Sequence, residues 1–66
     1  MITNNIGEAA GKIWESLSLK GDSTVAKLRK ELDLDAFVAN AALGWLARED
    51  KVELTKKGNS ISVALK

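Results

Sequence analysis

Apolar residues recur at helical spacing through the first third of the chain. From position 6, six apolar residues are separated by steps of 3, 1, 3, 1 and 3, which places them on one stripe of an α-helix. These residues are Ile6, Ala9, Ala10, Ile13, Trp14 and Leu17. Asn5 and Glu8 have the spacing of a capping box, with Asn in place of the usual Ser or Thr. We therefore predict a helix from about Asn5 to Ser18.

A second, short helix follows a stop signal that contains glycine. Gly21 suits the left-handed conformation that ends many helices, and either Asp22 or Ser23 can cap the next helix. The residues that this helix would turn inward are Val25, Leu28 and Leu32. Lys27 and Lys30 would point outward, and with Arg29 they form a small basic cluster in the chain. Such a cluster on a short helix is more often a solvated face than a binding site.

The connection from Asp33 to Asp35 is short enough for a helix-turn-helix. Asp33 tolerates the left-handed conformation that such a turn requires, and Asp35 is a good N-cap for a third helix that we predict to extend to Asp50. The apolar arc of this helix consists of Val38, Ala39, Ala42, Leu43, Trp45 and Leu46. A tight turn between a short helix and a longer one is typical of the helix-turn-helix. The third helix would then occupy the position of the recognition helix.

The hydrophobic period changes from 3.6 to 2 after the third helix. Two short segments alternate apolar and polar positions, as expected for half-buried strands. The apolar positions are Val52, Leu54, Ile61, Val63 and Leu65. Between the segments, the run from Lys56 to Asn59 contains Gly58 and predicts the turn of a hairpin. The pattern thus predicts an α+β winged helix-turn-helix, three helices followed by a short antiparallel β-hairpin wing, in a single domain over residues 1–66.

The composition excludes most kinds of chemistry. The chain has no Cys and no His, so thiolate and imidazole ligands and the usual base for a serine nucleophile are absent from the sequence. The close carboxylate pairs, Asp33 with Asp35 and Glu49 with Asp50, fall at helix boundaries, where capping and turn roles explain them. No phosphate-binding or dinucleotide-binding motif is present. We therefore expect no catalytic residues, no metal site, no cofactor and no small-molecule substrate.

Hydropathy and charge narrow the expected location and partners. No signal-peptide pattern is present, and no apolar run approaches the ~20 residues of a membrane helix, so we expect a cytoplasmic protein without a membrane role. The net charge of +1 gives no strong electrostatic attraction to nucleic acid or to a membrane. Residues 50–66 hold four lysines against Asp50 and Glu53, so the basic excess lies in the C-terminal quarter.

Double-stranded DNA is one candidate partner. In a winged helix, the third helix enters the major groove and the wing contacts the backbone or the minor groove. The candidate nucleic-acid-binding residues are Asn40, Arg48, Lys56, Lys57, Lys27 and Lys30. Asn40 could read adenine and Arg48 could contact a phosphate, while the lysines would hold the wing and the second helix to the backbone. The carboxylates of Asp33 and Asp35 lie at the N-terminal end of the third helix, where they disfavour the approach of a phosphate. The expected affinity for DNA is therefore weak and salt-dependent.

Another protein, or a second copy of this chain, is the other candidate partner. The exposed side of the third helix carries little charge, which is typical of interface cores. The candidate interface residues are Phe37, Ala41, Gly44 and Trp45. For Trp45 we favour the alternative that its ring is half-buried beneath the wing. Phe37 either packs against the helix-turn-helix turn or contacts a partner.

Two glycines interrupt the first helix. Gly7 and Gly11 each destabilise a helix by roughly 1 kcal/mol relative to Ala, and they share one flank with Ser18 beside Trp14. They occur there by chance, or they allow close packing on a neighbouring helix of the same chain. The alternative is a self-association face.

The chain resembles a bacterial family of small stand-alone winged helix-turn-helix domains in two runs, Leu32–Asp35 and Ala42–Val52. The ALGWLAREDK segment is the distinctive part, and the similarity covers nearly the whole chain. This resemblance implies the fold and assigns no activity. More distantly, the chain resembles the winged helices of bacterial transcription regulators, which implies DNA binding and a role in transcription. Those usually carry Ser, Thr, Arg or Lys on the exposed face of the third helix, where this chain has Phe37, Ala41 and Gly44.

Two functional hypotheses follow from these observations. The first is a non-catalytic, DNA-binding and transcription-associated module. The alternative is a protein–protein interaction or dimerisation module that uses the exposed face of the third helix.

Overall fold

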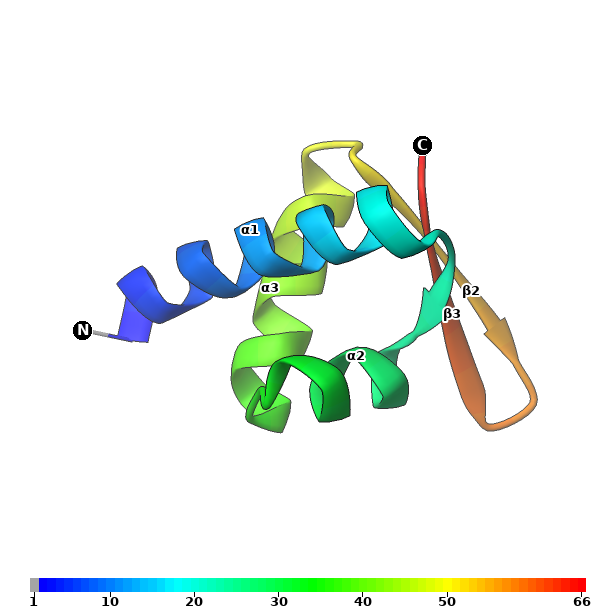
Figure 1. Ribbon diagram of the computed structural model, residues 1–66, viewed down its shortest axis with the longest axis horizontal. Helices are drawn as coiled ribbons and strands as arrows, with labels where there is room; N and C mark the ends of the chain where they lie inside the picture. The colour runs from blue at the N-terminus through cyan, green and yellow to red at the C-terminus, as the bar shows by residue number, and fades with distance from the viewer. Residues whose placement is uncertain (1) are drawn as a thin grey trace.

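The computed structural model describes residues 2–66, with side chains from residue 5 onward, and contains three helices and a three-stranded sheet (Figure 1). The elements in chain order are α1 (Ile2–Lys20), β1 (Ser23–Thr24), α2 (Val25–Leu32), α3 (Ala36–Arg48), β2 (Val52–Lys57) and β3 (Ser60–Leu65). The winged helix-turn-helix predicted from the sequence is confirmed. The sheet has one more strand than the predicted hairpin.

The additional strand, β1, pairs with the side of β3 that the hairpin leaves free. The strand order is β1-β3-β2, all antiparallel, so β3 is the central strand. Val63 on β3 lies opposite Ser23 on one side and Leu54 on the other. A two-residue strand is too short to show an alternating pattern, which is why the sequence did not predict it.

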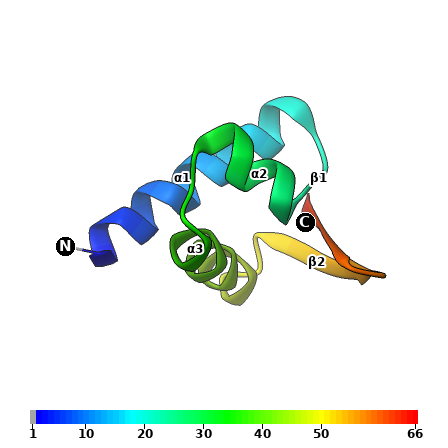
Figure 2. The ribbon, with the colours of Figure 1, turned by 90° about the horizontal axis from the view of Figure 1, so that it is seen from below.

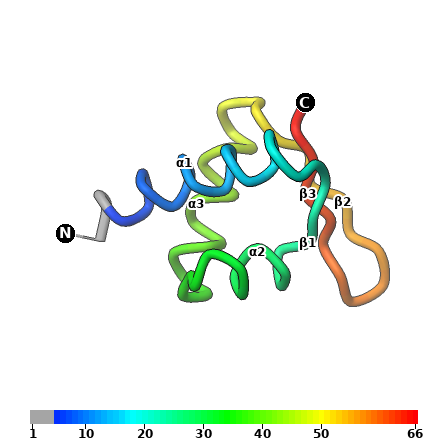
Figure 3. The backbone as a smooth tube through the Cα atoms, in the orientation of Figure 1, coloured from blue at the N-terminus to red at the C-terminus, as the bar shows by residue number. Residues whose placement is uncertain are grey.

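The core lies where α1, α2, α3 and the sheet meet. Its central side chains are Ile13, Leu28 and Val63, one each from α1, α2 and β3, and each is at most 1% exposed. The other buried apolar residues are Ala9, Ala10, Leu17, Ala39, Ala42, Leu43, Leu46 and Val52. α1 crosses α3 and continues beyond it toward the N-terminus, as the backbone trace also shows (Figures 1 and 3). The small alanines of α1 and α3 allow these two helices to approach each other closely.

The predicted helix starts need two corrections. α1 already begins at Ile2 and ends at Lys20, so the predicted capping box at Asn5 is wrong, because the chain is helical before that residue. α2 is capped by Thr24, whose Oγ1 accepts a hydrogen bond from the backbone N–H of Lys27 at 3.2 Å. Asp22 and Ser23 were the predicted caps, but pairing of Ser23 with β3 moves the cap to the next residue.

The helix-turn-helix connection has the predicted geometry. Asp33 adopts the left-handed conformation with φ of 52°, and Asp35 caps α3. The backbone N–H of Leu34 donates to the carbonyl of Arg29 at 2.9 Å, and the Arg29 Nε–H donates to the carbonyl of Leu34 at 3.4 Å. These bonds close the turn and fix the direction in which α3 leaves it. α3 ends at Arg48, slightly earlier than the predicted Asp50.

The β2–β3 hairpin is tighter than predicted. Lys56 and Lys57 belong to β2, so the turn consists of Gly58 and Asn59, and Gly58 has a φ of 60°. The other end of the sheet is tied to the turn after α3. There the backbone N–H of Lys66 donates to the carbonyl of Lys51 at 3.1 Å.

Candidate functional site

α3 and the β2–β3 hairpin form one side of the molecule, and α1 and α2 form the other (Figure 2). This is the arrangement in which a winged helix presents its third helix and wing together. Asn40 is exposed in the middle of α3. Gly44 follows one turn later, and a Cβ atom added there would meet nothing within 4 Å. A base edge could therefore approach the α3 backbone closely beside Asn40.

The five cations predicted to bind nucleic acid are all exposed. They are Lys27, Lys30, Arg48, Lys56 and Lys57. Among the side chains that the structure describes, the ion pairs are Lys20 with Glu31 at 3.4 Å and Lys66 with Asp50. The five predicted cations thus have no carboxylate partner in this part of the chain, and their charge is available to solvent or to a polyanion.

The structure does not bring these cations into one cluster. Arg48 lies in the last turn of α3, where its charge also interacts favourably with the helix dipole. Lys57 lies at the far end of β2, a six-residue strand that spans about 20 Å. Lys56 and Lys57 are adjacent on the strand and so point to opposite faces of the sheet. A bound duplex would contact these side chains at separate points along its backbone.

Backbone N–H groups at the N-terminus of α3 are capped by a carboxylate of the chain itself. Asp35 Oδ2 accepts hydrogen bonds from the backbone N–H groups of Phe37 at 3.1 Å and Val38 at 3.4 Å. These are amide groups that a phosphate could otherwise occupy. Any contact of α3 with DNA would therefore depend on side chains farther along the helix.

The four predicted protein-interface residues share one face of α3. Phe37, Ala41 and Trp45 form a row at intervals of four residues, with Gly44 beside it. Phe37 is 59% exposed and Trp45 is 56% exposed. Phe37 is not among the apolar residues that pack against the core, so its ring is open to solvent or to a partner.

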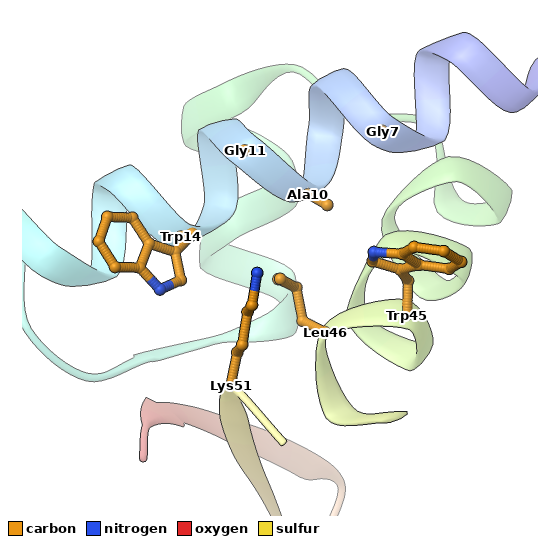
Figure 4. Close-up of a pocket in the computed structure, with 7 residues that line it drawn as sticks. All are labelled: Gly7, Ala10, Gly11, Trp14, Trp45, Leu46 and Lys51. Atoms are coloured by element: carbon orange, nitrogen blue, oxygen red, sulfur yellow. The ribbon is translucent and has the colours of Figure 1, made fainter. Parts of the chain in front are cut away.

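The favoured prediction for Trp45, a ring half-buried beneath the wing, is wrong. Trp45 instead lines a groove of about 450 Å³ where α1 crosses α3 (Figure 4). The groove is lined by Gly7, Ala10, Gly11, Trp14, Trp45, Leu46 and Lys51. Trp14 and Trp45 lie on opposite sides of it, and the Lys51 side chain extends between them. Sequence reasoning missed this groove, although both Trp residues lie toward the edges of their apolar stripes.

Close packing within the chain does not explain Gly7 and Gly11. A Cβ atom added at either residue would meet nothing within 4 Å. Both glycines are exposed. The hypothesis that they make room for a neighbouring helix of the same chain is therefore wrong.

The described residues contain neither a membrane-spanning helix nor a cluster of metal-binding side chains. Across residues 2–66, no helix is both long and apolar enough to cross a membrane. The same part of the chain contains no group of three or more acidic, Cys or His side chains that could hold a metal ion.

Three helices, a helix-turn-helix connection capped by Asp35 and a β-hairpin define the winged helix-turn-helix class. The chain belongs to the family described as winged helix-turn-helix domain (DUF2582), which matches residues 1–65. It is 38% identical over 64 residues to an uncharacterized protein of Methanocaldococcus jannaschii, a match that covers 92% of this chain and 90% of that protein. No solved structure matches the chain.

Proposed function

We propose that this domain is a transcription-associated module that binds double-stranded DNA weakly through α3 and the β2–β3 hairpin. The observation that carries the proposal is the set of five exposed cations without a carboxylate partner among the described side chains. α3 itself, from Ala36 to Arg48, contains no Asp or Glu, so nothing within the helix repels a phosphate backbone. The family's winged helix-turn-helix fold supports the same assignment.

The residues divide into two roles. Asn40 would face the bases, where an Asn amide can bond both adenine N6 and N7. Arg48, Lys56 and Lys57 would contact phosphates, which positions the domain without reading sequence. Lys27 and Lys30 would add charge from α2. If all five cations neutralise phosphates, log K should fall with log salt at a slope of about −4.5.

The direct test is fluorescence anisotropy with a mixed-sequence duplex at low ionic strength. Lys57→Glu should weaken binding several-fold and reduce the salt slope by about 1 or more. Lys12→Glu is the matched control, because Lys12 is exposed on α1 and the change in net charge is identical. Equal losses in the two variants, or no loss in Lys57→Glu, would overturn the proposed wing contact.

Asn40→Ala separates base reading from backbone contact. Its average affinity for random duplexes should be unchanged, because phosphate contacts supply non-specific binding. A selection from a random duplex pool should show a weaker preference than the parent domain at one base-pair position. Identical preferences in the two proteins would remove Asn40 from the site.

A protein-binding face on α3 is the second candidate function. The exposed Phe37 and Trp45, together with Ala41, favour it because aromatic residues in a weakly charged surface are typical of interface cores. Phe37→Asp should abolish partner capture or self-association while leaving the fold intact. An unchanged sedimentation profile and an unchanged set of captured partners would rule out this face.

A further inference from the structure

The outer edge of β2 is left unpaired by the fold. β2 is the last strand in the order β1-β3-β2, and no other strand of the described chain lies beside it. None of the backbone hydrogen bonds outside the helices and strands involves residues 52–57. All of these residues except Val52 are exposed, and the hairpin extends beyond the helices (Figures 1 and 2). A strand edge of this kind can pair with a strand of another molecule.

The hydrogen bonds of the hairpin determine which backbone groups point to this edge. The backbone N–H of Lys66 donates to the carbonyl of Lys51, so this carbonyl points toward β3. Successive residues of a strand direct their N–H and C=O groups to alternate sides. The groups that point away from β3 are therefore the backbone N–H and C=O of Val52, Leu54 and Lys56. These are the donors and acceptors that the edge offers to another strand.

We propose that β2 of a second copy pairs antiparallel with this edge, across a two-fold axis at Thr55. Such an axis is perpendicular to the sheet and keeps the same face of both copies on one side. Because side chains alternate between the faces, the axis passes through a residue and not between two. With the axis at Thr55, Leu54 of each copy exchanges both backbone hydrogen bonds with Lys56 of the other. Both residues direct these groups outward, as the pairing requires.

The charges of β2 complement each other in this register. Glu53 of each copy lies opposite Lys57 of the other, so opposite charges meet twice. Within its own sheet, Glu53 lies opposite Ala64 and Lys57 lies opposite Ser60, so neither has a charged partner across the hairpin. Both side chains are exposed and belong to neither described ion pair. A second copy therefore supplies the cross-strand partner that each of them lacks.

The same charges disfavour the other registers. An axis at Glu53 or at Lys56 would place that residue opposite its own copy, and like charges directly opposite are destabilising. An axis at Leu54 would place Lys57 opposite Lys51. Charged residues commonly protect a strand edge from pairing. Here they do so at the neighbouring registers and allow pairing at one.

The expected dimer is weak. One strand from each copy forms a smaller interface than the about 800 Å² per partner of a standard complex. The dimer does not rest on the proposed DNA binding. It uses Lys57, which the wing would otherwise direct to a phosphate, so adding duplex should shift the domain toward the monomer.

Sedimentation equilibrium without DNA, over concentrations that reach the millimolar range, tests the pairing. Lys56→Pro should raise the dimer dissociation constant roughly tenfold or more, because the N–H group that donates to Leu54 of the other copy is lost twice. This N–H points away from β3, so proline removes no hydrogen bond of the monomer. Lys56→Ala is the matched control, because it removes the same charge and keeps the N–H. It should dimerise much more tightly than Lys56→Pro, and equal dissociation constants would overturn the proposal.

A charge exchange tests the register. Glu53→Lys and Lys57→Glu should each dimerise more weakly than the wild type, because like charges then lie opposite each other twice. An equimolar mixture of the two variants should form a heterodimer, since each charge then meets its opposite. A mixture that stays as monomeric as the separate variants would overturn the register.

Phe37→Asp distinguishes this edge from the α3 face. Phe37 lies outside the hairpin, so this variant should dimerise as the wild type does. Loss of the dimer would assign self-association to α3 and overturn the pairing of β2. A wild-type protein that stays monomeric at every concentration would also overturn it, and would leave the edge to a strand of another protein. Because no DNA is present, none of these results bears on the proposed DNA binding.

Discussion

Oδ2 of Asp35 accepts a hydrogen bond from the backbone N–H of Phe37 at 3.1 Å, so a carboxylate of the chain itself caps the N-terminus of α3. The cap stabilises α3, which contributes Ala39, Ala42, Leu43 and Leu46 to the core. It also places a negative charge at the end of the helix that would approach a duplex. Helix stability and affinity for DNA are therefore opposed at this one residue.

Asp35→Asn should separate these two effects. Asn caps helices about as well as Asp, so the free energy of unfolding should change by less than about 0.5 kcal/mol. The lost negative charge should tighten DNA binding a few-fold at low salt. Asp35→Ala, the control for the cap, should lower the free energy of unfolding by about 1 kcal/mol. Urea unfolding and anisotropy measure the two quantities, and an Asn variant that binds DNA no better would contradict the account.

The core prediction concerns Ile13, which is fully buried between the helices and the sheet. Ile13→Ala should lower the free energy of unfolding by about 2–5 kcal/mol. A domain of this size is stable by only about 3–10 kcal/mol, so this loss removes a large fraction of its stability. Leu19→Ala is the control, because Leu19 is 77% exposed and its loss should change stability by less than about 0.5 kcal/mol. Equal losses of unfolding free energy in the two variants would contradict the assignment of Ile13 to the core.

Local chemistry was sufficient to predict the helix-turn-helix. The left-handed Asp33 and the Asp35 cap depend on backbone preferences of single residues, and the structure has both. The capping box at Asn5 failed because the same pattern can occur inside a helix that starts earlier. A capping pattern in the sequence therefore marks the start of a helix only where the residues before it are not helical themselves.

The candidate site was less predictable because it depends on how the helices cross. Trp14 and Trp45 each lie toward the edge of an apolar stripe, and a stripe does not say whether its edge is covered. Whether these two side chains are covered depends on where α1 and α3 cross. The sequence of one helix alone does not determine that crossing. The open surface at Gly7 and Gly11 has the same origin, since a missing side chain has meaning only once its neighbours are known.

The pair formed by Lys66 and Asp50 gives a pH-dependent prediction. A hydrogen bond to the Asp50 carboxylate, and then its negative charge, raise the pKa of Lys66 above the ordinary value of 10.5. Because the folded-state pKa is the higher one, this charged pair contributes its full stabilisation from neutral pH up to about 10.5 and loses it as the pH rises through the folded-state pKa. An NMR titration of the Lys66 side chain should give a lower pKa in Asp50→Asn. An unchanged pKa would show that the pair does not form in solution.

The most direct test of the central claim is an amide chemical-shift titration with a mixed-sequence duplex at low ionic strength. DNA binding through α3 and the hairpin predicts shifts along α3 around Asn40 and at the end of the hairpin around Lys57. These shifts should disappear when salt is added, because the contacts are mainly with phosphates. Unchanged amides at both places, at duplex concentrations that saturate a known winged-helix domain, would contradict DNA binding by this protein.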